Sequence, residues 1–137
     1  MEMYPFILEP VYKEKVWGGQ KLREHFGKDI PPFKKIGESW ELADLPNGDS
    51  LISNGPLAGN KLGDIARKFP VEITGAPEFD GRFPLLIKFI DAENDLSVQV
   101  HPDPEACRQM GTGEPKTECW YIISARPGAV IYKGLKE

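Results

Sequence analysis

Glycine and proline constrain the fold of this chain more than any other feature of its sequence. There are 14 glycines and 13 prolines among the 137 residues, about 20% of the chain where an average protein has about 12%. They follow no repeating triplet, so they mark many separate turns, and frequent turns favour short strands over long helices. No serine- or glycine-rich linker divides the chain, and residues 1–137 are therefore expected to form one domain.

The composition is that of an ordinary folded protein, and it narrows the range of partners. Hydrophobic residues make up 40% and charged residues 28% of the chain, and 17 basic against 21 acidic side chains give a net charge of −4. A chain of this size can bury roughly two-thirds of its unfolded surface, enough for a core without disulfides. Because phosphate binding needs clustered cationic side chains, nucleic acid is not expected as a partner.

The sequence shows no sign of a membrane or secreted protein. No apolar run reaches the roughly 20 residues needed to cross a bilayer, and the N-terminal residues lack the basic and apolar regions of a secretory signal. The two cysteines, Cys107 and Cys119, are too few for a disulfide framework. We therefore expect no membrane partner and a cytoplasmic localisation.

Three helical segments are predicted from local signals. Residues 20–26 suit a short helix that the following glycine stops in a left-handed conformation. Residues 60–69 carry apolar side chains at helical spacing, with Asn60 as the N-cap and Pro70 as the stop. A helical turn after Asp103 is capped by that aspartate and ended by a glycine.

The remaining pattern is one of short strands. Residues 1–17 are expected to be irregular or extended because they contain prolines, and residues 46–49 form a turn. The predicted strands are residues 36–43, 50–53, 85–90, 96–101, 118–123 and 129–132. Short strands between tight turns predict a mainly β fold, a sandwich or small barrel with a few short helices.

Polar and apolar residues alternate in the predicted strand over residues 96–101. Because residues two apart in a strand face the same way, Ser97, Gln99 and His101 share one face. The apolar residues between them share the other and should pack against a second layer. The polar face should then point into a cavity.

The predicted strand that follows residues 96–101 along the chain carries a second polar set. Lys116, Glu118 and Trp120 share one face by the same period of two. If both polar faces line one cavity, Gln99, His101 and Glu118 can converge on one point. An imidazole, a carboxylate and an amide oxygen would suit Zn²⁺ or another divalent metal. By spacing alone, however, a single histidine beside a proline is more often a packed or surface residue.

Five segments, in their order along the chain, carry a resemblance to a known family. The segments are Val16-Trp-Gly-Gly19, Ile36-Gly-Glu-Ser-Trp-Glu-Leu42, Phe83-Pro-Leu-Leu-Ile-Lys88, Leu96-Ser-Val-Gln-Val-His-Pro-Asp103 and Pro115-Lys-Thr-Glu-Cys-Trp-Tyr121. They resemble the type I mannose-6-phosphate isomerases, zinc-dependent cupins built on a jelly-roll barrel, and the resemblance runs from about residue 10 to residue 132.

The resemblance implies roles for particular residues. The implied metal ligands are Gln99, His101 and Glu118, and the implied catalytic residue is Lys116. The residues implied to bind substrate are Ser97, Lys88 and Trp17. Each has a plainer alternative: a serine can cap a strand end, a lysine can protect a sheet edge or simply be solvated, and a tryptophan can be part of the core.

The resemblance implies a metal-dependent isomerase that interconverts mannose 6-phosphate and fructose 6-phosphate by moving a proton between C1 and C2 through an enediol. Family members are considerably longer and supply a further metal-binding histidine and a catalytic arginine. His25 is not expected to substitute for that histidine. The jelly roll is therefore expected to lack its C-terminal strands and to form a homodimer through an exposed sheet edge. Two alternatives remain: a noncatalytic sugar-phosphate-binding or regulatory cupin, and another metal cupin such as an oxygenase.

Overall fold

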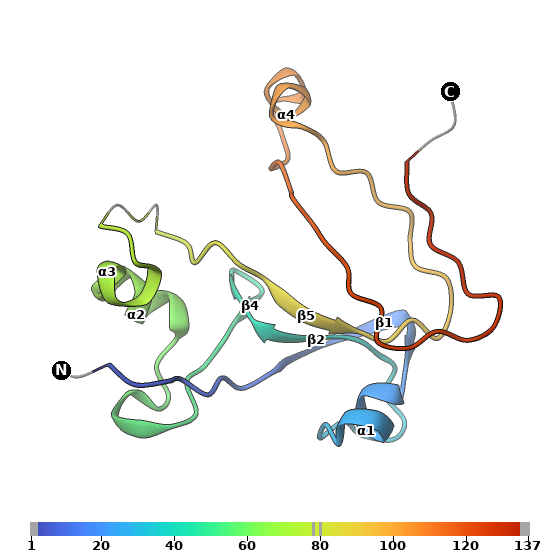
Figure 1. Cartoon of the computed structure of the whole chain (residues 1–137), viewed down its shortest axis with the longest axis horizontal. Coiled ribbons are helices and arrows are strands. Elements are labelled where there is room, and N and C mark those ends of the chain that lie inside the picture. Colours follow the sequence, from blue (N-terminus) through green and yellow to red (C-terminus); the bar gives the residue numbers. More distant parts are fainter. Residues whose placement is uncertain (1–2, 78, 80, 135–137) are drawn as a thin grey trace. The chain divides into compact units, whose positions relative to one another are not determined.

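The structure, a computed structural model, describes residues 3–77, 79 and 81–134. The chain divides into two compact units, of which the first ends at Leu96 and the second begins at Ser97. Figure 1 shows the elements of each unit along the sequence. The two units are described separately below.

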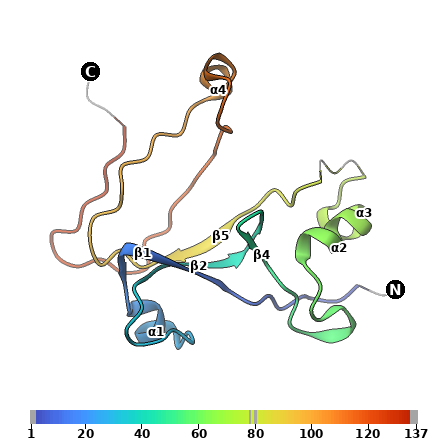
Figure 2. The same ribbon diagram turned by 180° about the vertical axis from the view of Figure 1, so that it is seen from behind.

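A three-stranded antiparallel sheet forms the centre of the first unit, with the central strand β2 paired to both others. Trp40 in the central strand pairs with Val11 on one side and Lys88 on the other. Figure 2 shows the three strands side by side. The strands are β1 (Val11–Gly19), β2 (Ile36–Leu42) and β5 (Ile87–Ile90).

A bulge in β1 depends on close contact between two glycines. Glu14 and Gly19 both pair with Ile36, so the residues between them bulge out of the ladder. A Cβ on Gly18 would lie 2.4 Å from the backbone nitrogen of Gly37. Since a backbone atom cannot move aside as a side chain can, only glycine fits at position 18.

A small apolar core lies against one face of this sheet. Leu22, Ile30 and Ile36 are each no more than 3% exposed and contact one another, with Tyr12 and Phe89 packed against them. Leu22 comes from α1 (Lys21–Phe26). This helix confirms the prediction over residues 20–26, including its left-handed stop at the following glycine.

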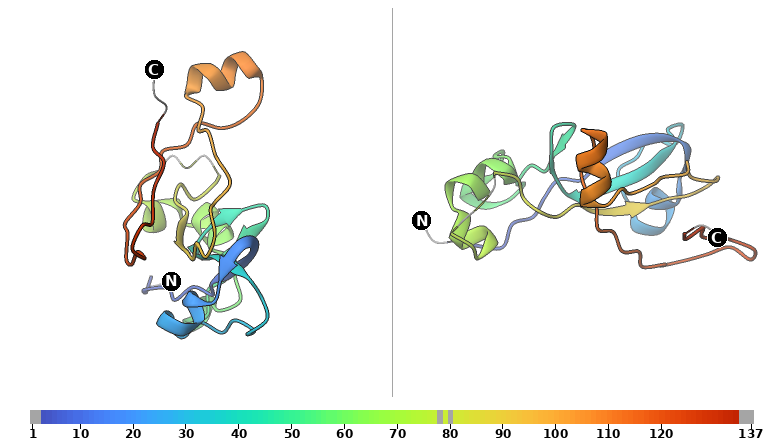
Figure 3. Two further views of the ribbon diagram at one scale, coloured as in Figure 1. Left: turned by 90° about the vertical axis from the view of Figure 1, so that its right-hand side faces the viewer. Right: turned by 90° about the horizontal axis from the view of Figure 1, so that it is seen from above.

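Two further helices follow a small hairpin in the first unit. Strands β3 (Asp44–Leu45) and β4 (Gly48–Asp49) pair across the predicted turn, and a 3₁₀ turn η1 (Gly55–Leu57) comes next. Helix α2 (Leu62–Lys68) buries its apolar face as predicted, and α3 (Pro70–Thr74) packs beside it, as Figure 3 shows.

Three details of the first unit differ from the sequence prediction. Asn60 does not cap α2: its side chain donates to the carbonyl of Leu57, and the N-cap position belongs to Lys61. Residues 50–53 form isolated bridges instead of a strand. Pro70 ends α2, but it also begins α3, because proline is compatible with the first turn of a helix. The expected extended structure over residues 1–17 is confirmed from β1 onward.

The second unit contains one regular element among its described residues, helix α4 (Pro104–Met110). The Asp103 side chain accepts a 2.8 Å hydrogen bond from the backbone nitrogen of Ala106, which confirms the predicted N-cap. Gly111 adopts a left-handed conformation, with φ of 66°, and ends the helix as predicted. This helix reverses the chain between two long segments.

The strands predicted over residues 96–101, 118–123 and 129–132 are wrong. In the described part of the chain these segments belong to no ladder, and Val98 and Tyr121 are 95% and 89% exposed. A strand needs a hydrogen-bonded neighbour, which a pattern of apolar residues cannot supply. The homodimer was expected to form through an exposed edge of these predicted strands, and it stays a prediction. Among the described helices, none is long and apolar enough to span a bilayer.

Candidate functional site

Glu118 is the centre of a polar cluster in the second unit. Its Oε2 atom lies 3.4 Å from Nε2 of His101 and also forms an ion pair with the ammonium of Lys116. Its Oε1 atom accepts a hydrogen bond of 2.5 Å from the indole nitrogen of Trp120. The expectation that residues 116, 118 and 120 share one side of the chain is therefore confirmed, although the segment is extended without being a strand.

The contacts of Glu118 fix its charge. The hydrogen bond from Lys116, followed by the one from Trp120, lowers the pKa of this carboxyl group to about 2, although partial burial opposes the shift. The Glu118 side chain is 23% and the His101 side chain 32% exposed. At neutral pH an ionised carboxylate thus faces the imidazole of a partly exposed side chain.

The structure brings two of the three predicted metal ligands, His101 and Glu118, into contact. The third, Gln99, precedes α4 and has an exposed side chain, as does Ser97, which was predicted to bind substrate. No cluster of three or more histidine, cysteine, aspartate or glutamate side chains is found among the described residues. The groups that the structure shows together are therefore one imidazole and one carboxylate.

A second carboxylate cluster lies on the sheet of the first unit, around Glu38. Glu38 is 6% exposed and accepts a hydrogen bond of 2.9 Å from Lys88 and one of 2.8 Å from the indole nitrogen of Trp40. Burial raises the pKa of Glu38, but the bonds from Lys88 and Trp40 outweigh it and hold the pKa below its ordinary value. Lys88, predicted to bind substrate, is thus held by a buried carboxylate.

Glu38 itself was missed by the sequence analysis. The signal was present, because a period of two places Glu38 and Trp40 on one face of β2. The strand partner opposite Trp40 is Lys88, and directly paired residues in a sheet face the same side. The pairing register that joins them could not be derived from the sequence.

Trp17, the third predicted substrate-binding residue, is buried in the first unit with 7% of its surface exposed. Its carbonyl accepts hydrogen bonds from the backbone nitrogens of Glu93 and Asn94. Its indole ring packs so tightly against Gly37 that a Cβ there would lie 2.5 Å from it. These contacts give Trp17 a packing role in the bulge of β1.

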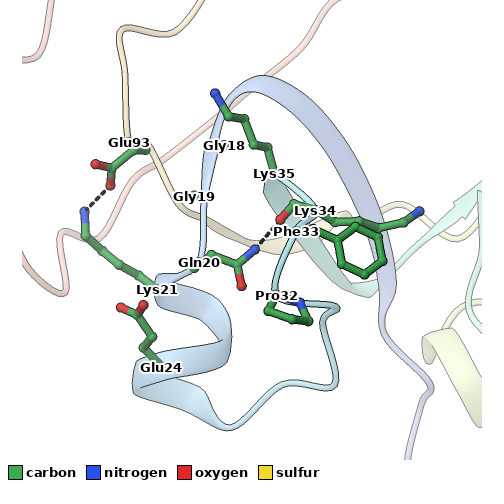
Figure 4. Close-up of a pocket in the computed structure, with 10 residues that line it drawn as sticks. All are labelled: Gly18, Gly19, Gln20, Lys21, Glu24, Pro32, Phe33, Lys34, Lys35 and Glu93. Carbon is green, nitrogen blue, oxygen red and sulfur yellow. Dashed lines mark hydrogen bonds and ion pairs between the residues drawn. The ribbon is translucent and has the colours of Figure 1, made fainter.

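A pocket of about 480 Å³ lies beside this bulge, lined by residues 18–21, 24, 32–35 and 93. Figure 4 shows that its groups bind one another: the Lys21 ammonium pairs with Glu93 at 3.3 Å, and the Gln20 amide donates to the carbonyl of Lys34. None of the residues predicted to bind metal or substrate lines it.

A family model and two relatives all relate this chain to mannose-6-phosphate isomerases, also called phosphomannose isomerases. The sequence model of the phosphomannose isomerase type I catalytic domain matches residues 6–119. The chain is 48% identical to the probable mannose-6-phosphate isomerase GmuF of Bacillus subtilis, over 96% of this chain and 41% of that protein. It is 42% identical to the mannose-6-phosphate isomerase of Streptococcus mutans, over 95% of this chain and 40% of that one. It thus spans about two fifths of the length of these relatives.

A solved structure extends the comparison to the fold. The crystal structure of the mannose 6-phosphate isomerase from Bacillus subtilis matches with a TM-score of 0.72 at 41% identity, over 82% of this chain and 35% of that one. The predicted fold class, a mainly β cupin with a few short helices, is confirmed by this match. On sequence and structure together, the chain belongs to the phosphomannose isomerase type I family.

Proposed function

We propose that this protein acts as a metal-dependent aldose–ketose isomerase that interconverts mannose 6-phosphate and fructose 6-phosphate. The observation that carries the proposal is the pairing of His101 with Glu118, 3.4 Å apart, beside the ammonium of Lys116. The similarity to proteins named as mannose-6-phosphate isomerases supports the reaction and the substrate.

The spacing of the two donors fits a divalent metal such as Zn²⁺. Two ligands that each lie about 2.0–2.1 Å from a tetrahedral zinc ion are roughly 3.3 Å from each other, which agrees with the 3.4 Å between His101 and Glu118. The lowered pKa of Glu118 keeps it in the ionised form that a metal requires. We propose His101 and Glu118 as ligands, with Gln99 as a third through its amide oxygen.

The chemistry can be divided among the groups of the site. A bound divalent metal would polarise the oxygens on C1 and C2 of the sugar and stabilise the negative charge that develops there. Lys116 would hold or deliver a proton at these oxygens, because its ammonium lies beside Glu118, a proposed ligand. An ammonium group has three donors, and Glu38 accepts one from Lys88, so Lys88 retains donors for the substrate phosphate. Ser97 is proposed as a further substrate-binding residue.

The experiment measures zinc content and isomerase turnover on the same preparation. We expect the chain to bind zinc, and His101→Ala to lower its zinc content strongly while circular dichroism shows the fold unchanged. His25→Ala is the matched control, because His25 is the only other histidine and lies exposed on α1. Its zinc content should equal that of the unsubstituted chain.

The outcomes separate the candidate functions. Conversion of mannose 6-phosphate that depends on zinc and on His101 supports the isomerase. Binding of the sugar phosphate without conversion would indicate the noncatalytic cupin instead. If His101→Ala and His25→Ala retain the same zinc content, His101 is not a ligand and the proposed metal site is wrong.

A further inference from the structure

Trp120 has no place in the proposed function, yet its indole makes a strong contact with the centre of the site. Its Nε1 atom donates to Oε1 of Glu118 at 2.5 Å. The residue is 52% exposed, which is unusual for a large aromatic side chain. Apolar burial therefore does not account for its position, and the hydrogen bond is the contact that holds the ring beside Glu118.

The two oxygens of Glu118 have different partners. Oε1 faces the indole of Trp120, whereas Oε2 faces His101 at 3.4 Å and also the ammonium of Lys116. A carboxylate turns about its last bond with little resistance, and such a turn would move both oxygens away from these partners. An indole N–H is a donor only, and a bond to a charged acceptor is stronger than a neutral one. The contact therefore opposes that rotation.

We infer that Trp120 is a positioning residue, which holds Oε1 of Glu118 so that Oε2 faces His101 and is available to a metal. The inference rests on the proposed metal site. Groups that hydrogen-bond to a metal ligand fix its orientation, and their loss typically lowers metal affinity about 10- to 100-fold. Trp120 would act through Glu118 and touch neither metal nor substrate.

Lys116 should act in the opposite direction on metal affinity. Its ammonium binds Oε2, the oxygen that would bind the metal, so the two cations compete for one atom. Trp120 binds the other oxygen and does not compete. Removal of the Lys116 ammonium should therefore strengthen metal binding, and removal of the Trp120 N–H should weaken it. A role of Trp120 in packing alone does not predict this difference in sign.

The test is titration of the whole chain with Zn²⁺ by calorimetry and with Co²⁺ by visible absorption. Trp120→Phe keeps an aromatic ring and removes the donor, and we expect its dissociation constants to rise about 10- to 100-fold, with an altered Co²⁺ spectrum. Lys116→Met should lower them. Tyr121→Phe is the matched control, because this neighbouring aromatic residue is 89% exposed, and it should leave affinity and spectrum unchanged.

Two further substitutions distinguish a failure of this inference from a failure of the proposed site. Glu118→Gln and His101→Ala should each abolish most Zn²⁺ binding; if they do not, the metal site itself is wrong and the inference falls with it. If they do, but Trp120→Phe binds both metals with unchanged affinity and spectrum, the site stands and Trp120 is not a positioning residue. Should Trp120→Phe fail to fold, Lys116→Met decides. Unchanged or weaker metal binding in that variant overturns the assignment of Oε1 to Trp120 and of Oε2 to the metal.

Discussion

The two units of this protein each contain a glutamate held by a lysine and by the indole of a tryptophan two residues later. In the first unit the carboxylate is Glu38, buried on the sheet and bound by Lys88 from another strand and by Trp40. In the second unit it is Glu118, partly exposed and bound by Lys116 and Trp120 from its own segment. The same three groups thus occur in two different surroundings.

The two carboxylates differ in their solvent exposure and in the further side chains that contact them. Each oxygen of Glu38 has one donor, Lys88 on Oε1 and Trp40 on Oε2, and the site is largely closed to solvent. Oε2 of Glu118 also has an imidazole within 3.4 Å, and an imidazole is a good metal ligand. A Glu-x-Trp pair with a lysine thus fastens a sheet where it is buried and, under the proposed function, presents a metal ligand where it is open.

The largest expected effect tests the difference in packing between the two units. Leu22→Ala in the first unit should lower the free energy of unfolding by about 3 kcal/mol, because it removes buried contacts at a residue that is 2% exposed. Val100→Ala in the second unit should change it by less than about 0.5 kcal/mol, since Val100 is 83% exposed. Urea unfolding measures both. Equal losses would mean that both units have packed cores.

A smaller effect compares the two carboxylates directly. Glu38→Gln should lower the free energy of unfolding by about 2 kcal/mol, less than the 3–5 kcal/mol typical of a fully buried ion pair, because the Lys88 side chain is 21% exposed. Glu118→Gln should cost less than about 1 kcal/mol, as exposed ion pairs do. Urea unfolding at neutral pH without metal gives both values. A larger loss for Glu118→Gln would reverse the assignment of structural and ligand roles.

The smallest effect is a pH dependence that belongs to Glu38. Its pKa in the folded protein lies below the ordinary value of 4.5, so on acidification the unfolded chain binds this proton first. The stability that Glu38 contributes is fully present above the unfolded pKa and is lost as pH falls through the folded pKa. The difference in unfolding free energy between the unsubstituted chain and Glu38→Gln should therefore narrow from pH 7 to pH 3. A constant difference would contradict the proposed charge pairing.

Local signals predicted much of the fold. Helix α1 and its glycine stop, the buried face of α2, and the Asp103 cap of α4 all depend on residues within a few positions of one another. The strand predictions were less successful. Strands β2 and β5 are present as predicted. The segments after Leu96 were wrongly predicted as strands because they are rich in β-branched and aromatic residues. A ladder requires a partner strand, and no local pattern shows whether that partner exists.

The part of the candidate site that lies on one segment was predictable, because side chains alternate in direction along an extended chain. A period of two placed Glu118 beside Lys116 and Trp120, and the structure shows both contacts. The approach of His101 depends on how the chain between them folds, and the resemblance to a family suggested it where spacing could not. The contact of Glu38 with Lys88 joins residues 50 positions apart and needed the pairing register of the sheet.

Helix α4 connects His101 to Glu118, and this connection affects how easily the two side chains meet. Closing a flexible loop costs conformational entropy that grows with the logarithm of the number of free residues, by about 0.6 kcal/mol for each doubling. The seven residues of α4, fixed between Asp103 and Gly111, are removed from that count. The helix therefore acts as a rigid spacer that shortens the effective loop, so part of the ordering required for a ligand to bridge His101 and Glu118 is already present before the ligand arrives.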